Sequence, residues 1–381
     1  MRILHIISGG EVGGSKKHLI SLSNELKNKE IKNIVVTLMD GELYKEAKAC
    51  GIDVRLIKQK NRMDLSVVDE IQRICQNENI DIINCHGGRA NFLGALLKNK
   101  NKYNAKYVST IHSDYKEDYK GNRYKTIVYS NINKNALKSF DYYITVSNTF
   151  KNMLIQRGFD SSKIMVVYNG IDFDKQRETF NINDVVSKYN LPYRKHYVSM
   201  VARLHPVKGH KVFLDSINIV LRQFSDVQFL IVGEGDILSD LKAYADNLGI
   251  SNNVSFLGFQ KPDEFYSISD FTVLTSYTES FPLSILESAY YKKPVISTNV
   301  GGISDLIEDD FNGYLVEPND KETLSKRMLE LLNDNNKAVI FGDRIYNKAK
   351  KLYSLENFAN SYIRIYNYIL TGEKKWKKKI I

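Results

Sequence analysis

Residues 196–208 read H-Y-V-S-M-V-A-R-L-H-P-V-K, and the chain continues G-H-K-V-F-L. The apolar run 196–201 predicts a buried strand, and residues 211–221 predict an amphipathic helix. The loop between them carries Arg203 and Lys208. A strand, a loop bearing cations and a helix are the usual beginning of a doubly wound α/β domain.

The N-terminus repeats this pattern. Residues 2–7 predict a strand, G-G-E-V-G-G-S-K-K forms a glycine-rich loop, and residues 18–26 predict a helix. The length of 381 residues has room for two domains of ordinary size. The sequence therefore predicts two Rossmann-like domains in tandem, each built on a parallel sheet.

Further short β-branched runs alternate with amphipathic stretches, as in a doubly wound sheet. The expected strands are 34–38, 80–85, 107–111, 142–146 and 164–168 in the first domain, and 228–232, 254–257, 271–274 and 294–297 in the second. The expected bounds are 1–180 for the N-terminal domain, 181–194 for a linker and 195–354 for the C-terminal domain. Residues 355–381 should form a helix and a basic tail that pack back toward the N-terminal domain.

Composition is that of a globular protein, with 43% hydrophobic and 26% charged residues. No apolar run approaches the roughly 18 residues of a membrane span, so we expect a cytoplasmic protein. Cys50, Cys75 and Cys85 lack paired spacing and read as small buried hydrophobic residues in a reducing compartment.

The net charge of +10 is uneven, because residues 1–180 alone carry +9. It is densest over residues 98–138, where tyrosines are interspersed. Such a region suits an anionic membrane surface, an acidic acceptor or nucleic acid, and equally a solvated basic face. No nucleic-acid-binding signature accompanies it, so we expect no nucleic-acid partner.

Residues 278–290 read T-E-S-F-P-L-S-I-L-E-S-A-Y, which places Glu279 just before a predicted helix and Glu287 inside it. Ser280 is a possible N-cap and Pro282 suits the first turn. Free N–H groups bind anions, and carboxylates accept hydrogen bonds from sugar hydroxyls. The alternative is a loop acid and a solvated helix face.

Several motifs in order along the chain carry a resemblance. They are G-G-S-K-K-H, T-I-H-S-D at 110–114, N-G-I-D at 169–172, V-A-R-L-H-P-V-K-G-H, V-G-E-G, F-L-G-F, the two glutamates eight residues apart, and a later V-G-G. Together they are similar to the retaining family 4 glycosyltransferases of the GT-B fold, which has two Rossmann-like domains facing a cleft. The resemblance spans nearly the whole chain.

The resemblance implies a nucleotide-sugar donor and a site on the second domain. Arg203 and Lys208 would neutralise the charge that builds on the departing diphosphate, which suits fixed cations. Glu287 would bind the ribose hydroxyls, and Glu279 would hold the transferred sugar. The remaining expected donor-binding residues are Gly13, Gly14, Gly233, Gly258, Phe259, Ser280, Phe281, Pro282, Leu283 and Gly301. The glycines are equally compatible with ordinary tight turns.

His112 follows a predicted strand, where functional side chains of open α/β sheets gather. In its T-I-H-S-D context it would hydrogen-bond the donor sugar or the reacting centre, although a lone histidine there can be structural. The expected acceptor-side residues are His86, Asp114 and Lys116.

Asp172 and Asp174 form D-F-D, a spacing that binds a divalent metal in GT-A glycosyltransferases. Here the pair falls where the first domain closes, so we expect no metal, no cofactor and activity that survives EDTA.

We therefore expect transfer of a hexose-type sugar, with UDP as the family's usual nucleotide and retention of configuration. The acceptor would be a glycan, a lipid-linked molecule or a polysaccharide precursor, presented at the inner face of a membrane. A GT-B-fold epimerase or hydrolase, or a sugar-nucleotide-binding protein without activity, would use the same residues. A Rossmann dehydrogenase is disfavoured because G-G-E-V-G-G-S lacks the G-x-G-x-x-G spacing.

Overall fold

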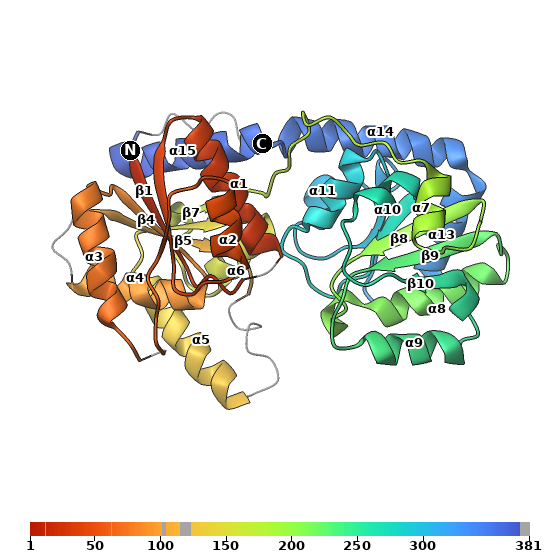
Figure 1. Cartoon of the computed structure of the whole chain (residues 1–381), viewed down its shortest axis with the longest axis horizontal. Helices are drawn as coiled ribbons and strands as arrows, with labels where there is room; N and C mark the ends of the chain where they lie inside the picture. The colour runs from red at the N-terminus through yellow and green to blue at the C-terminus, as the bar shows by residue number, and fades with distance from the viewer. Residues whose placement is uncertain (12, 62, 101–103, 115–122, 374–381) are drawn as a thin grey trace. The chain divides into compact units, whose positions relative to one another are not determined.

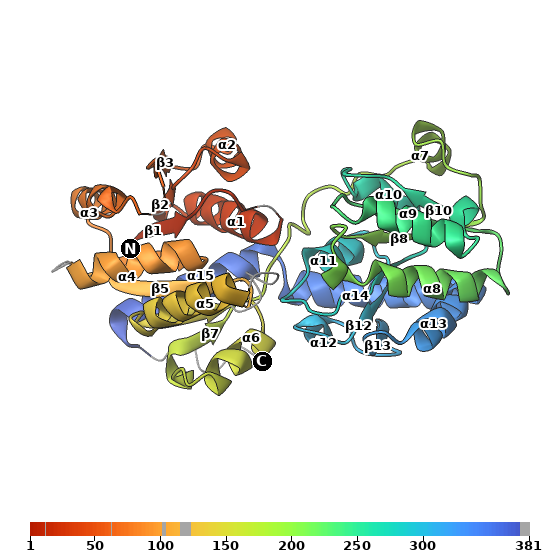
Figure 2. The same ribbon diagram turned by 90° about the horizontal axis from the view of Figure 1, so that it is seen from below.

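The computed structural model describes residues 1–11, 13–61, 63–100, 104–114 and 123–373. The chain divides into two compact units (Figure 1). Unit 1 comprises Met1–Gly170 and Leu355–Ile381, and unit 2 comprises Ile171–Ser354. In each unit, helices cover both faces of a parallel sheet (Figures 1 and 2).

Unit 1 contains a seven-stranded parallel sheet in the order β3-β2-β1-β4-β5-β6-β7. The strands are β1 (Arg2–Ile7), β2 (Lys32–Thr37), β3 (Val54–Leu56), β4 (Ile82–His86), β5 (Lys106–Ile111), β6 (Tyr142–Thr145) and β7 (Ile164–Val166). The order reverses beside β1, which pairs with both β2 and β4. In open α/β sheets, ligands bind at the carboxyl ends of the strands at such a point.

The helices of unit 1 are α1 (Gly14–Asn28), α2 (Glu42–Ala49), α3 (Ser66–Glu78), α4 (Gly88–Lys100), α5 (Arg123–Lys138), α6 (Asn148–Gln156), the 3₁₀ turn η1 (Ser161–Lys163) and α15 (Leu355–Thr371). Helices α3 to α6 contribute to the core on one face of the sheet. On the other face, α1 and α15 pack against Ile3, Ile82 and Val108. Helix α15 reaches this face although it follows the whole of unit 2 in sequence.

Unit 2 contains a six-stranded parallel sheet in the order β10-β9-β8-β11-β12-β13. The strands are β8 (His196–Val201), β9 (Val227–Val232), β10 (Val254–Phe256), β11 (Phe271–Leu274), β12 (Val295–Thr298) and β13 (Gly313–Val316). Here the order reverses beside β8, which pairs with β9 and β11. The loops after β8 and β11 are therefore the expected place for a ligand in this unit.

The helical segments of unit 2 are α7 (Ile182–Lys188), η2 (Pro206–Lys208), α8 (His210–Leu221), α9 (Leu238–Asn247), η3 (Ser251–Asn253), α10 (Asp263–Ile268), α11 (Leu283–Tyr290), α12 (Ile303–Leu306), α13 (Lys321–Asn333) and α14 (Asn335–Leu352). Helices α8, α9 and α13 supply the core on one face of the sheet. Helices α7 and α10 supply a smaller cluster on the other face.

The expected fold class, two doubly wound parallel-sheet domains, is confirmed. The structure differs from the expected bounds in two places. Residues 171–180, expected in the N-terminal domain, belong to unit 2. Residues 181–194 were expected to form a linker, but they contain α7, whose Val185 and Val186 are buried with Leu191 against α10. Because this segment is mostly polar, its sequence does not indicate that Val185, Val186 and Leu191 belong to the core of unit 2. Strands β3 and β13 were also missed.

No described helix is both long enough and apolar enough to cross a membrane.

Candidate active site

The loop after β8 and the loop after β11 meet in unit 2 through Lys208 and Glu279. Lys208 Nζ lies 2.5 Å from Glu279 Oε1, which also accepts a hydrogen bond of 2.6 Å from Ser276 Oγ. The side chain of Glu279 is 8% exposed and that of Lys208 is 20% exposed. The second carboxylate oxygen, Oε2, accepts no hydrogen bond from the described residues. The pair thus leaves one acceptor oxygen and two ammonium N–H groups for a ligand.

The backbone holds Lys208 in this position. Lys208 ends the turn η2, and Thr275 Oγ1 lies 3.0 Å from the carbonyl oxygens of both Lys208 and Gly209, which share its one O–H donor. Gly209 adopts φ +69°, and a Cβ there would lie 2.1 Å from the Thr275 carbonyl oxygen. Glycine is therefore required where the β8 loop crosses the end of β11.

Arg203 lies two residues beyond β8 and is exposed. Its guanidinium makes no hydrogen bond or ion pair with any residue in the described part of the chain. An unpaired guanidinium at the carboxyl end of a central strand can bind two oxygens of an anion without first breaking another contact.

The segment 278–290 forms a shorter helix than the sequence predicted. Helix α11 begins at Leu283, with Pro282 at the N-cap and no side-chain cap, so Ser280 does not cap it. Instead the Ser280 carbonyl accepts a 2.8 Å hydrogen bond from Gly302 N–H. Phe281 is buried, and its ring centroid lies 4.9 Å from that of Tyr353. Because Phe281 packs against Tyr353, it lies outside the helix, which begins two residues later at Leu283.

Gly301 approaches the same segment from the loop after β12. It adopts φ +64°, and a Cβ there would lie 2.0 Å from the Glu279 carbonyl oxygen. Gly301 thus allows the β12 loop to contact the backbone that carries Glu279.

Glu287, in α11, accepts a 3.2 Å hydrogen bond from the Tyr266 hydroxyl of α10. Burial, and then the Glu287 charge, raise the pKa of Tyr266 well above its ordinary value. The hydroxyl therefore stays protonated and donates to the carboxylate. Glu287 is half-buried, so the contact fixes its orientation rather than hiding it.

Gly233, Gly258 and Phe259 lie at the ends of β9 and β10. Gly233 N–H donates a 2.8 Å hydrogen bond to the Gly258 carbonyl. The next residue, Phe259, is 77% exposed. The exposed Phe259 ring, next to the hydrogen-bonded pair Gly233 and Gly258, offers a surface for stacking against a flat ligand group.

In unit 1, Gly13 is the N-cap of α1 and Gly14 is its first residue. A Cβ at either position would meet no atom within 4 Å. The first turn of α1 also leaves backbone N–H groups that can bind an anion.

His86 and His112 are brought into contact. His86 ends β4, His112 follows β5, and His86 Nδ1 lies 2.9 Å from His112 Nε2. Two histidines that the sequence analysis overlooked complete the group. His5 Nδ1, in β1, lies 3.1 Å from His86 Nε2, and the His18 ring, in α1, stacks edge-on against His112 at 4.6 Å.

His5 joins this group through the register of the sheet. It is paired in register with Asn84, and His86 is paired with Thr110, so His5, His86 and His112 lie on one face of the sheet. Recognising this requires the pairing of non-adjacent strands, which a single sequence does not give. His18 comes from a helix over that face and carries no such signal.

Burial is the main reason that this cluster stays uncharged. It lowers the pKa of His5 to about 3 and that of His18 to about 4. It also lowers the pKa of His86 and of His112 well below the ordinary value. All four rings are therefore neutral at physiological pH.

Asp114 forms a two-point ion pair with Arg157, with N–O distances of 2.8 and 2.6 Å. The third expected acceptor-side residue, Lys116, lies outside the described residues.

The D-F-D segment forms a turn. Asp172 Oδ1 accepts hydrogen bonds from the N–H groups of Asp174 and Lys175, and Asp174 pairs with Lys350 at 2.9 Å. Across the described part of the chain, no group of three or more His, Cys, Asp or Glu is arranged to hold a metal ion.

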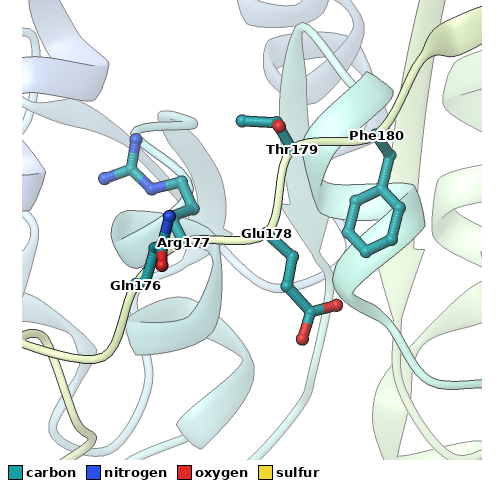
Figure 3. Close-up of a pocket in the computed structure, with 5 residues that line it drawn as sticks. All are labelled: Gln176, Arg177, Glu178, Thr179 and Phe180. Atoms are coloured by element: carbon teal, nitrogen blue, oxygen red, sulfur yellow. The ribbon is translucent and has the colours of Figure 1, made fainter.

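A hollow in unit 2 is lined by Gln176, Arg177, Glu178, Thr179 and Phe180 (Figure 3). These are five consecutive residues of one extended segment. A binding site gathers polar groups from several elements, which this hollow does not, so we do not assign it a function.

Comparison with known families gives two matches that together span most of the chain. Residues 12–175 match the model described as Glycosyltransferase Family 4, and residues 181–349 match the model described as Glycosyl transferases group 1. The boundary between the two matches falls close to the division between units 1 and 2.

Curated relatives include the UDP-Gal:alpha-D-GlcNAc-diphosphoundecaprenol alpha-1,3-galactosyltransferase of Escherichia coli, 27% identical over 71% of each chain. Another is the N-acetyl-alpha-D-glucosaminyl L-malate synthase of Bacillus anthracis, 26% identical over 82% of this chain and 81% of the relative. Among solved structures, Anabaena Alr3699/HepE in complex with UDP-glucose has a TM-score of 0.83 at 20% identity, covering 96% and 99% of the two chains. That likeness supports the fold.

Proposed function

This chain belongs to glycosyltransferase family 4 and is a glycosyltransferase of the GT-B type, and on that premise we propose the reaction that it catalyses. It moves a hexose-type sugar from a UDP-sugar to a hydroxyl of a glycan, lipid-linked or polysaccharide-precursor acceptor, with retention of configuration. The observation that carries this proposal is the arrangement of Arg203, Lys208 and Glu279 at the ends of β8 and β11.

The cations stabilise the leaving group. As the bond between the anomeric carbon and the phosphate oxygen breaks, charge builds on the diphosphate, and the transition state is bound more tightly than the donor. Arg203 grips two phosphate oxygens, and Lys208 donates its remaining N–H groups while one stays on Glu279.

The carboxylates hold the two ends of the donor. Glu279 Oε2 accepts a hydrogen bond from a hydroxyl of the transferred sugar, and Glu287, oriented by Tyr266, accepts from the ribose hydroxyls. Phe259 and the glycines at 233, 258 and 301 line the approach of the nucleotide. Relatives that act on a diphosphoundecaprenol-linked sugar or use UDP-Gal by name motivate the choice of UDP and of a lipid-linked acceptor.

Lys208 balances the charge of Glu279 at Oε1, and Oε2 is assigned to a sugar hydroxyl, so we do not assign Glu279 as a nucleophile on the anomeric carbon. The acceptor oxygen instead attacks on the face that the diphosphate leaves. A new carbon–oxygen bond forms, the carbon–phosphate-oxygen bond breaks, and the acceptor proton passes to the departing phosphate oxygen. This route retains the configuration of the donor.

The test is a screen of nucleotide sugars by thermal shift, followed by product analysis with and without candidate acceptors. The Arg203→Ala variant should lower kcat/KM on the order of 10²- to 10³-fold, the scale for losing one preorganised charge-stabilising group. Arg222→Ala is the matched control, because Arg222 is an exposed arginine at the far end of α8. It should leave the rate unchanged.

Three outcomes would overturn parts of the proposal. A change under threefold in Arg203→Ala would show that the phosphate binds elsewhere. A β-linked product from an α-linked donor, seen by NMR, would exclude retention. Turnover of UDP-sugar without any acceptor would favour an epimerase or hydrolase.

A further inference from the structure

His5, His86 and His112 form a chain of hydrogen bonds across three neighbouring strands of unit 1, β1, β4 and β5. His5 Nδ1 lies 3.1 Å from His86 Nε2, and His86 Nδ1 lies 2.9 Å from His112 Nε2. The rings of His86 and His112 are stacked at an interplanar angle of 25°. His5 and His86 are at most 1% exposed, whereas His112 is half-buried.

The fourth histidine stands outside this chain. His18 Nδ1 lies 2.7 Å from Asn169 Oδ1, an oxygen that only accepts, so His18 Nδ1 carries the proton. Its Nε2 then accepts from the Tyr362 hydroxyl of α15 at 2.8 Å. Both nitrogens of His18 therefore have hydrogen-bond partners, and its ring packs edge-on against the ring of His112.

A neutral imidazole has one N–H and one lone pair, so each nitrogen–nitrogen bond needs one of each. The three rings are neutral because burial lowers the pKa of each. Only two arrangements satisfy both bonds. Either all three rings carry the proton on Nδ1, or all three carry it on Nε2, so the form of His112 is set by that of His5.

The inner end of the chain distinguishes the two arrangements. His5 Nε2 is buried and makes no hydrogen bond within the described chain. With the protons on Nε2, this atom would be a buried N–H donor without an acceptor. With the protons on Nδ1, it is only an unused lone pair, and unpaired buried N–H groups are the rarer defect.

We infer that His5 and His86 are positioning residues that hold His112 in the Nδ1–H form, so that it donates a hydrogen bond to a substrate oxygen. The inference rests on the proposed function and deepens it. In this form the Nδ1 of His112 carries a proton and cannot accept one, so His112 does not act as the general base. The oxygen that receives this bond belongs to a sugar hydroxyl or a phosphate.

The experiment is long-range ¹H–¹⁵N correlation NMR on the full chain with ¹⁵N-labelled histidine at pH 7.5, without ligand. We expect His5, His86 and His112 each to show a protonated Nδ1 and a bare Nε2. His112 with a protonated Nε2, or with two protonated nitrogens, would overturn the inference.

Two variants of His86 test the coupling. His86→Gln keeps an acceptor and a donor, so it can still link His5 to His112, whereas His86→Leu keeps neither. We expect His86→Leu to release His112 into a mixture of both forms. It should lower kcat roughly 10- to 100-fold, by analogy with the loss of a partner that orients a metal-bound imidazole, with little change in donor KM.

His86→Gln should recover most of that loss. Equal losses in the two variants with wild-type His112 signals would show that position 86 is merely structural, and would contradict the inference. Circular dichroism checks that both variants fold.

Failure of this inference is distinguishable from failure of the proposed function. The tautomer is measured without substrate, so it is decided even if no sugar is transferred. Conversely, transfer by a protein whose His112 carries its proton on Nε2 would leave the proposed function standing.

Discussion

Gly301 tests how closely the site depends on one backbone contact. Replacement by alanine places a Cβ 2.0 Å from the Glu279 carbonyl oxygen, at a backbone angle of φ +64°. The 278–280 segment must move, and it takes with it the carboxylate that pairs with Lys208. We expect Gly301→Ala to lower transfer activity at least 10-fold and to destabilise unit 2 by more than about 1 kcal/mol, the cost of the angle alone.

Gly249→Ala is the control for that experiment. Gly249 has nearly the same angle, φ +71°, but a Cβ there meets no atom within 4 Å. It should cost about 1 kcal/mol in the free energy of unfolding and leave activity unchanged. Urea unfolding and initial rates on both variants provide the comparison. Equal activity in the two variants would mean that the position of Glu279 does not matter.

Prediction from the sequence worked best for residues that can be assigned from the motif in their own loop. Lys208 and Glu279 were assigned to one site from their own motifs, and the structure pairs them. His86 and His112 were assigned separately, and their contact could not be foreseen. It depends on β4 lying beside β5, while His5 joins them only because β1 lies beside β4.

The same limit applies to secondary structure. Strands β8 and β9 are buried along nearly their whole length, and their mostly apolar sequences predict them. Strand β3 has three half-buried residues at the sheet edge, which is too short for a periodic pattern. Helix α7 lies in a polar segment, where its Asn181 N-cap and the burial of Val185 and Val186 against α10 stabilise it.

The cluster of His5, His18, His86 and His112 should make the stability of unit 1 sensitive to acid. Burial lowers the pKa of His5 to about 3 and of His18 to about 4, from an ordinary value of 6.5. Between these values the unfolded chain binds protons that the folded unit does not, so acid favours unfolding. Stability is full above about pH 6.5 and falls as the pH drops toward 4.

We expect His5 and His18 each to cost about 2 kcal/mol in the free energy of unfolding as the pH falls to 5. Calorimetry from pH 7.5 to 5 should show a falling transition temperature for unit 1. The fall should be smaller in His5→Phe, which removes one group. His205→Asn is the control, because His205 is exposed and asparagine can keep its cap on Val207 N–H. Parallel curves for His5→Phe and wild type would contradict the assignment.

Across the whole chain, most of the net charge and most of the candidate donor-binding residues lie in different units. The candidate donor-binding residues from Arg203 to Gly301 belong to unit 2, whereas residues 1–180 carry +9 of the net charge of +10. The tail adds five lysines, Lys374, Lys375, Lys377, Lys378 and Lys379, which lie outside the described residues. A basic region apart from the donor residues is what a lipid-linked acceptor at an anionic surface would need.

We therefore predict that the full chain sediments with vesicles containing anionic lipid, and not with neutral phosphatidylcholine vesicles. Binding should weaken steeply as salt rises, because exposed charges are screened. Changing Lys377, Lys378 and Lys379 of the tail to glutamine should weaken binding about fivefold per lysine, since each contributes about 1 kcal/mol near such a surface. The matched control changes three exposed lysines of unit 2, Lys242, Lys261 and Lys326, and should bind as wild type. Binding that does not change with salt or with lipid charge would show that the excess of basic residues serves solubility alone. The enzyme would then bind its acceptor away from the membrane.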